Sequence, residues 1–187
     1  AVTAQSCDLG ISVDPDVDRL CFVSEDGSFF GEEYTLVAVA DHVLAHTPGP
    51  TVSNLSSTRA LREVSARHGC TYTAAAVGEV NVVAQMREVG AILGGEGNGG
   101  VILTEIDPGR DAAVGVALVL EVIARSGQSL EEILATLPQY AIEKRKVQSD
   151  RELLPRAINR LLAAYPDAYV HPVEDGSKLY LSGKLEC

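Results

Sequence analysis

Three aspartates and one arginine are packed into the segment DPDVDR, residues 14–19. Carboxylates spaced two residues apart repel one another, which raises their pKa values and weakens a fold unless a cation lies among them. Carboxylate oxygens with open coordination positions suit Mg²⁺, which also takes oxygens from phosphates. Arg19 adds a guanidinium suited to a bidentate grip on a phosphate. The segment therefore predicts a Mg²⁺ site at Asp14, Asp16 and Asp18, with a phosphate contact at Arg19.

Two other interpretations of this segment remain open. It could be a solvated acidic turn in which Arg19 pairs locally. Asp14, Asp16, Asp18 and Glu25 also occupy positions 1, 3, 5 and 12 of an EF-hand calcium loop. That loop needs glycine at position 6, where this chain has Arg19, and it needs flanking helices where this chain has strand-like segments. The EF-hand interpretation is therefore disfavoured.

A second candidate site is the segment GGEGNGG, residues 94–100, which lies between two short apolar runs. Glycines allow the backbone to approach a ligand closely, and the side chains of Glu96 and Asn98 offer hydrogen-bond groups for neighbouring sugar hydroxyls. The segment is neither a Walker loop nor a dinucleotide-binding G-x-G-x-x-G turn. The alternative is a flexible connection between two strands.

The other polar candidates predict less chemistry. His42 and His46 are four residues apart on one expected helix, without the glutamate of an H-E-x-x-H zinc motif, so we expect a surface or capping role. His68 lies near the end of an expected helix and should interact with its C-terminus. Ser56 and Ser57 have no evident base partner and are not nominated as nucleophiles.

Composition narrows the class of protein. The 187 residues are 46% hydrophobic and 22% charged, which predicts folded protein from about Leu9 onwards. The net charge of −11 disfavours nucleic acid as a partner. Four widely spaced cysteines fit a reducing compartment, and no targeting segment or apolar run of membrane-spanning length is evident. We expect a cytoplasmic protein that does not span a membrane.

Apolar spacing predicts alternating strands and helices, and therefore an α/β fold in which helices sandwich a mostly parallel or mixed sheet. A change of composition at Pro138 predicts an α+β tail, with a strand near 140–147, a helix containing Leu153 to Leu162, and a strand pair at 168–173 and 177–181. The expected strands before the tail are 9–13, 20–23, 51–54, 70–76, 91–93 and 101–103, and the expected helices are 32–46, 57–68, 81–88 and 112–125, with another beginning after Ser129.

The order of the two candidate loops resembles the α-D-phosphohexomutase superfamily. The resemblance is carried by DLGISVDPDVDRLCFVSEDGSFFGEEYT and the later GGEGNGG. The segments VSNLSSTRALREVSARHGCTYTAAAVGEVNVV and GRDAAVGVALVLEVIA are most similar to the phosphoglucosamine mutase branch, with phosphomannomutase/phosphoglucomutase close to it. The resemblance implies a four-domain enzyme that moves a phosphoryl group between C1 and C6 of a hexose, through a bisphosphorylated intermediate and a phosphoserine.

The resemblance also implies roles for individual residues. Arg19 matches the arginine beside the phosphoserine. Asn98 replaces the serine of the sugar loop, and Gly78-Glu79 matches a G-D-x-x-V loop that often carries a lysine or histidine, which is absent here. The implied cofactor is Mg²⁺, and the implied ligands are hexose phosphates and bisphosphates. The implied metal ligands are Asp14, Asp16 and Asp18, and the implied sugar-binding residues are Glu96, Gly97 and Asn98.

Two family motifs have no match in this sequence: the T-x-S-H-N-P segment with the phosphorylated serine, and the R-x-S-x-T-E-P phosphate loop. We therefore expect a fragment: residues 1–34 would end domain 2 with the metal loop, 35–137 would form domain 3 with the sugar loop, and 138–187 would begin domain 4. Alone, this chain should have little mutase activity. The alternative is a non-catalytic binding module, with a homodimer formed through the exposed edges of residues 1–30. The loops do not distinguish glucosamine, mannose and glucose phosphates.

Overall fold

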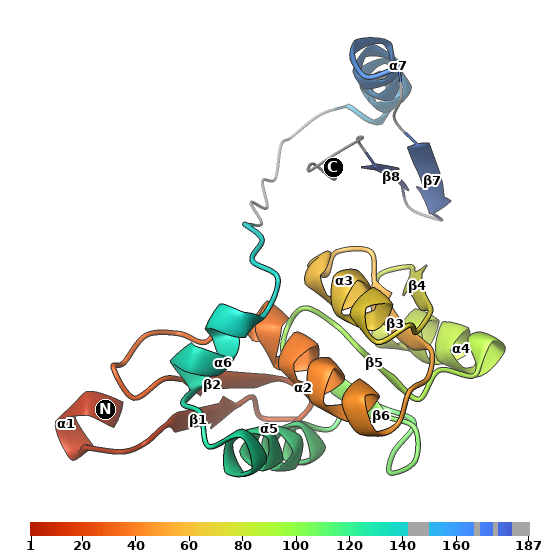
Figure 1. Ribbon diagram of the computed structural model, residues 1–187. Coiled ribbons are helices and arrows are strands. Elements are labelled where there is room, and N and C mark those ends of the chain that lie inside the picture. Colours follow the sequence, from red (N-terminus) through yellow and green to blue (C-terminus); the bar gives the residue numbers. More distant parts are fainter. Residues whose placement is uncertain (142–149, 167–168, 174–175, 181–187) are drawn as a thin grey trace. The chain divides into compact units, whose positions relative to one another are not determined.

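The computed structural model describes residues 1–141, 150–166, 169–173 and 176–180, which form two units, Ala1–Ala141 and Ile142–Cys187 (Figure 1). Each unit is considered by itself. The first contains both candidate loops.

The first unit begins with a short helix and a hairpin-like strand pair. Strands β1 (Gly10–Val13) and β2 (Leu20–Val23) pair antiparallel, so the acidic segment is the loop that joins them. This confirms the predicted strand–loop–strand arrangement and contradicts the helical flanks of an EF-hand. The helix α1 (Val2–Gln5) was not predicted, and the expectation that folded structure begins near Leu9 was wrong. Val2 is buried because its side chain lies against Gly10, where a Cβ atom would leave too little room.

A mixed four-stranded sheet forms the centre of the unit, in the order β4-β3-β5-β6. Strand β3 (Thr51–Asn54) pairs parallel with β4 (Tyr72–Ala75) and with β5 (Leu93–Gly95), and β5 pairs antiparallel with β6 (Val101–Leu103). The predicted mixed sheet is confirmed. The carboxyl ends of β3 and β5 lie at the same edge of the sheet, so the loops after them are neighbours.

Helices cover both faces of this sheet (Figure 1). On one face, α2 (Glu32–His46) and its neighbours pack over Leu93 and Val101 in the larger apolar cluster. On the other face, Met86 of α4 (Glu79–Val89) packs against Val52 and Ile102, and Gly94 leaves space for the Met86 side chain. The helices of the unit after α1 are α2 (Glu32–His46), α3 (Ala60–Arg67), α4 (Glu79–Val89), α5 (Ala112–Ser126) and α6 (Leu130–Thr136).

The unit extends as far as Tyr140 because two tyrosines fasten the chain beyond α6. The backbone N–H of Tyr140 donates to the Tyr34 hydroxyl at 2.8 Å, and that hydroxyl donates to the Pro138 carbonyl at 3.2 Å. The Tyr140 hydroxyl donates to Glu63 of α3.

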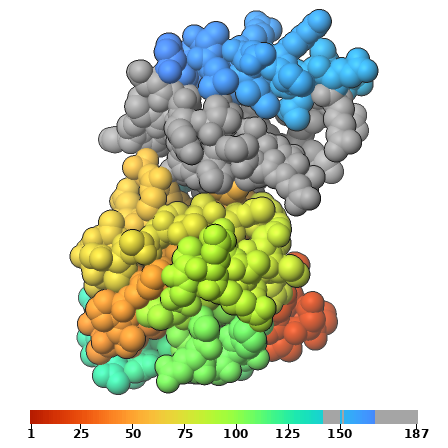
Figure 2. Space-filling model, turned by 90° about the vertical axis from the view of Figure 1, so that its right-hand side faces the viewer, coloured from red at the N-terminus to blue at the C-terminus, as the bar shows by residue number. Residues whose placement is uncertain are grey.

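On the face seen in Figure 2, the yellow and green segments that include α3 and α4 form most of the surface of this unit.

The second unit has a 3₁₀ turn at Arg151–Leu153, the helix α7 (Leu154–Ala164), and the antiparallel strands β7 (Tyr169–Val173) and β8 (Gly176–Tyr180). The predicted helix and strand pair of the tail are confirmed. Most of the strand predicted near 140–147 lies outside the described residues. Among the described residues no single helix combines the length and apolar character needed to cross a membrane; α5 and α6 do so only as a pair, bent by 88°.

Candidate functional site

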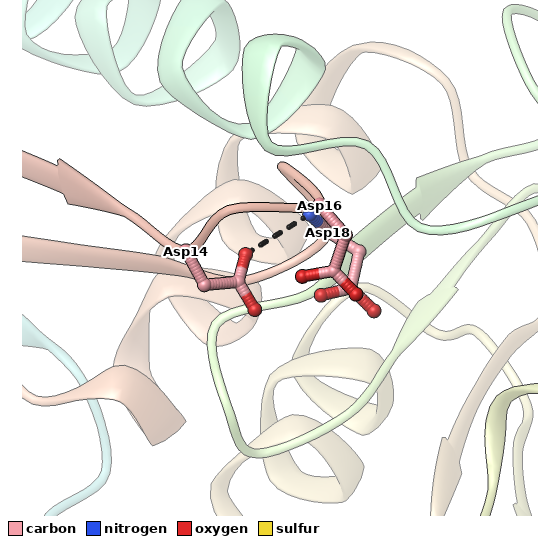
Figure 3. Close-up of side chains that lie close together, drawn as sticks. All are labelled: Asp14, Asp16 and Asp18. Atoms are coloured by element: carbon pink, nitrogen blue, oxygen red, sulfur yellow. Dashed lines mark hydrogen bonds between the residues drawn. The ribbon is translucent and has the colours of Figure 1, made fainter.

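The loop between β1 and β2 brings the three predicted aspartates together (Figure 3). One carboxylate oxygen from each of Asp14, Asp16 and Asp18 lies within 4.8 Å of the others. The turn is held from inside, because Asp14 Oδ1 accepts the backbone N–H groups of Asp18 at 3.2 Å and Arg19 at 3.1 Å. Val17 has a φ of 58°, which turns the chain sharply between the second and third aspartates.

The environments of Asp14 and Asp18 shift their pKa values in opposite directions. Desolvation acts to raise the pKa of Asp14, but the backbone N–H donors of Arg19 and Asp18 help to hold it below its ordinary value. Desolvation raises the pKa of Asp18, with only partial compensation from the guanidinium of Arg110. The buried Oδ1 atom of Asp18 has no hydrogen-bond donor among the described residues. The loop therefore contains a desolvated carboxylate oxygen that a cation would stabilise.

Arg19 lies beside the same carboxylates. Its Nε atom is 3.6 Å from Asp14 Oδ2 and 3.7 Å from Asp18 Oδ1, and its side chain is 58% exposed. These separations are too long for strong hydrogen bonds. The guanidinium can therefore approach an external phosphate while it stays next to the aspartates.

The glycine-rich segment is the loop between β5 and β6, and Glu96 is buried within it at 5% exposure. Glu96 Oε1 accepts the Asn54 side-chain amide at 2.5 Å and the Gly78 backbone N–H at 3.2 Å. Asn54 is the last residue of β3, and Gly78 lies in the loop after β4. The end of β3, the loop after β4 and the loop after β5 are thus connected through a single carboxylate.

Asn98 and Gly97 complete the predicted sugar loop. The Asn98 side chain donates to Glu96 Oε2 at 3.5 Å and accepts the Gly100 backbone N–H at 3.2 Å. The Gly97 N–H donates to the Ser57 hydroxyl at 2.8 Å. Ser57, which the sequence did not nominate for any role, therefore supports the loop. Its hydroxyl also donates to the Asn54 side-chain oxygen at 2.7 Å.

A close backbone contact brings this loop to the metal loop. Gly99 has a φ of +88° and lies so close to the Leu20 backbone that a Cβ atom at residue 99 would overlap the Leu20 carbonyl. Leu20 is the first residue of β2 and directly follows the aspartate loop. Glycine is required here both for its positive φ and for the absence of a side chain.

Arg110 joins the two loops directly, and the sequence did not predict it. Its side chain is 9% exposed, and it contacts Asp18, Glu96 Oε2 at 2.6 Å and Glu79 Oε2 at 3.3 Å. The Arg110 backbone N–H also donates to Glu79 Oε1 at 2.9 Å. In the sequence, the DPGRD segment indicates only a turn. The only sequence signal for a role of Arg110 is its positive charge, ten residues after the glycine-rich segment that carries Glu96.

The histidines lie elsewhere. His46 contacts the His42 carbonyl at 2.8 Å, and His42 lies 3.6 Å from Glu121. His68 is the C-terminal cap residue of α3, as expected. Its ring, however, pairs with a residue of α2, with 2.7 Å between His68 Nε2 and Asp41 Oδ1. A pocket of about 530 Å³ between α2, α5 and α6 includes His42 and His46, and none of the predicted site residues lines it.

The residues present fit a divalent cation. Carboxylate oxygens are hard ligands suited to Mg²⁺. The desolvated Asp18 Oδ1, without a donor in the described part of the chain, provides one oxygen for such an ion. Asp14 and Asp16 would provide the others from the same loop.

Comparison with known proteins identifies similar sequences and folds. Residues 31–140, more than half of the chain, match the family described as phosphoglucomutase/phosphomannomutase, alpha/beta/alpha domain III. The chain is 33% identical over 181 residues to a phosphoglucomutase/phosphomannomutase of Thermococcus kodakarensis, covering 95% of this chain and 39% of that protein. It is 35% identical over 172 residues to a phosphoglucosamine mutase of Koribacter versatilis, covering 86% of this chain and 36% of that protein. The chain thus spans well under half of either relative.

Solved structures give the same result. A phosphoglucomutase/phosphomannomutase family protein from Burkholderia thailandensis superposes with a TM-score of 0.80 at 27% identity, covering 97% of this chain and 39% of that one. An N-acetylphosphoglucosamine mutase from Aspergillus fumigatus, in complex with GlcNAc-6P and magnesium, shares the fold at a TM-score of 0.57 and 17% identity, covering 95% of this chain and 47% of that one. The chain therefore belongs to the α-D-phosphohexomutase superfamily and contains its α/β/α domain III.

Proposed function

We propose that this chain provides the metal loop and the sugar loop of a Mg²⁺-dependent phosphohexomutase, which transfers a phosphoryl group between C1 and C6 of a hexose phosphate. The observation that carries the proposal is the position of Arg110, which contacts Asp18 of the aspartate loop and Glu96 of the sugar loop. One buried side chain thus contacts both loops, which supports a single site. The mutase names of the relatives and the magnesium in the Aspergillus fumigatus complex support the assignment.

Each group has a distinct part in this proposal. Phosphoryl transfer depends mainly on positioning and on stabilisation of negative charge. Mg²⁺ held by the three aspartates would supply that charge stabilisation when bound. The exposed guanidinium of Arg19 would bind the phosphate beside the aspartates. Glu96 and Asn98 would orient the sugar through its hydroxyl groups.

We further propose that the 187-residue chain does not turn over by itself. Its sequence has no T-x-S-H-N-P segment to supply the phosphoserine, and transfer needs donor, acceptor and metal in one assembly. Purified chain incubated with glucose 1-phosphate, mannose 1-phosphate or glucosamine 1-phosphate should give no 6-phosphate above a blank. Steady conversion by the pure chain would contradict this part of the proposal.

The metal assignment is tested by unfolding the protein with and without Mg²⁺. Binding to the folded state alone stabilises by about 2.7 kcal/mol when free Mg²⁺ is 100 times the dissociation constant. We expect that response in the wild type and in Asp8→Asn, a control at an exposed aspartate outside the loop. Asp16→Asn should respond much less. No response in the wild type, or equal responses in all three proteins, would contradict the assignment.

A non-catalytic role in self-association is the second candidate. It is favoured by exposed apolar side chains within residues 1–30: Ile11 is 45% exposed, Val13 is 46% exposed and Phe29 is 75% exposed. Light scattering after size exclusion should then show a dimer at micromolar concentration, and Ile11→Lys should shift it to monomer. A wild-type protein that is monomeric throughout would exclude this candidate.

A further inference from the structure

Arg110 is held in place by its backbone as well as by its side chain. It lies between β6 and α5, next to Asp111, whose N–H donates to the Val101 carbonyl at 3.0 Å. One residue further, the Ala112 N–H donates to the Val17 carbonyl of the aspartate loop, also at 3.0 Å. The guanidinium is therefore directed at the carboxylates by a fixed turn, and its position does not depend on a flexible loop.

The contact between Arg110 and Asp18 opposes the binding of a cation. Arg110 Nη2 pairs with Asp18 Oδ2, and Asp18 Oδ1 is the buried oxygen that has no donor in the described residues. A divalent cation at Oδ1 would lie beside a guanidinium that is itself only 9% exposed. Like charges at such short range repel strongly when water is largely excluded. Arg110 should therefore lower the affinity of the aspartate loop for Mg²⁺.

The contact between Arg110 and Glu96 has the opposite effect on the sugar loop. Glu96 Oε1 has two donors of its own, Asn54 and Gly78. Its Oε2 atom relies on Arg110 at 2.6 Å, because its other contact, with Asn98, is 3.5 Å long. Without Arg110, a buried carboxylate oxygen would lose its main partner, and the sugar loop would lose its link to Asp18.

We propose that Arg110 is a positioning residue that acts in opposite directions on the two ligands of the site: it weakens divalent-cation binding at the aspartate loop and strengthens hexose phosphate binding by fixing Glu96. This inference rests on the proposed function. It distinguishes Arg110 from a residue needed only for folding, because general loosening of the site would weaken both ligands together.

Two titration series by calorimetry test the proposal. The first measures Mg²⁺ binding at constant ionic strength. The second measures glucose 1,6-bisphosphate binding with every variant saturated with Mg²⁺, so that a change in metal affinity does not alter the measured bisphosphate affinity. In Arg110→Gln, Mg²⁺ should bind about tenfold more tightly or better, because one positive charge is gone. The bisphosphate should bind about tenfold more weakly, because Glu96 Oε2 has lost its partner.

Two further variants serve as controls. Arg125→Gln makes the same charge change at a 60% exposed arginine that pairs with Glu121, and it should leave both affinities within about twofold of wild type. Arg110→Lys keeps the charge but lacks the planar fork whose three separate nitrogens contact the three carboxylates. Its Mg²⁺ affinity should stay near the wild-type value while bisphosphate binding falls. If Arg110→Gln does not fold, this split in the lysine variant carries the test.

The outcomes separate the two proposals. Opposite changes in Arg110→Gln, or the split in Arg110→Lys, support the role of Arg110. If the wild type binds both ligands and both Arg110 variants lose them in parallel, the role of Arg110 is wrong and the proposed function stands. If the wild type binds neither Mg²⁺ nor the bisphosphate, the proposed function is contradicted, and the role of Arg110 with it.

Discussion

The replacement Glu96→Gln tests how the sugar loop is held. Glu96 is 5% exposed and accepts hydrogen bonds on both carboxylate oxygens. Glutamine has nearly the same shape, but one oxygen becomes an amide NH₂ group, which only donates. In either orientation of the amide, NH₂ would face donors: Asn54 and Gly78 on one side, or Arg110 and Asn98 on the other.

The size of the effect follows from these contacts. A hydrogen bond to a charged group contributes about 1.5–3 kcal/mol, and a buried group left without a partner costs about 1–3 kcal/mol. The loss is limited because Arg110 keeps Asp18 and Glu79 as partners. We therefore expect Glu96→Gln to lower the free energy of unfolding by about 2–4 kcal/mol.

Urea unfolding followed by circular dichroism measures this difference. The matched control is Glu88→Gln on α4, which makes the same chemical change at an exposed glutamate and should stay within about 0.5 kcal/mol of wild type. If Glu96→Gln is as stable as Glu88→Gln, the Glu96 contacts do not hold the loop as described.

Three more predictions concern neighbouring features. Gly99→Ala should lose about 2 kcal/mol or more in urea unfolding, because alanine is strained at a φ of +88° and its Cβ would overlap the Leu20 carbonyl; wild-type stability would show that the two loops do not touch. Mg²⁺ affinity, measured by calorimetry, should fall as the pH is lowered and Asp18 takes up a proton. Because the pKa of Asp18 is raised above its ordinary value of 3.8, the loss should begin above pH 3.8. Constant affinity down to that pH would exclude Asp18 as a ligand. Asp111→Ala should lose about 1 kcal/mol in urea unfolding, because Asp111 accepts the Ala113 N–H at 2.7 Å and the Val114 N–H at 3.1 Å at the start of α5. An unchanged midpoint would argue against this cap.

The two loops could be predicted from the sequence because each is local. Three aspartates within five residues, and five glycines within seven, are visible without knowledge of the fold. The alternation of strands and helices likewise predicted the mixed sheet, because burial imposes the spacing of apolar residues. Each of these features is defined by residues that are close together in the sequence.

The partners of these loops could not be predicted in the same way. Arg110 contacts Asp18 across 92 residues of chain and Glu79 across 31. Asn54 reaches Glu96 across 42 residues. Each of these residues lies in a loop or at the end of a helix or strand, where its type is ordinary. Only the folded topology shows that they meet.

One helix boundary and the exposure of the first strand were also not predictable from the sequence. The helix predicted from Ser57 begins at Ala60, because the preceding residues bind elsewhere: the Ser57 hydroxyl to Asn54, and the Thr58 N–H to Glu33 at 2.8 Å. In the first strand, Ile11 and Val13 alternate with small or polar residues, and both side chains are half exposed in the structure. Within the described residues β1 pairs only with β2, in a sheet of two strands.

The central claim is that the aspartate loop and the sugar loop serve one ligand. The most direct test is the affinity for glucose 1,6-bisphosphate, measured by calorimetry in the wild type, Asp16→Asn and Glu96→Gln at one fixed Mg²⁺ concentration that just saturates the wild type. We predict that each replacement weakens binding at least about tenfold, which corresponds to 1.4 kcal/mol. If either replacement leaves the affinity unchanged while the protein remains folded, the two loops do not act on the same ligand.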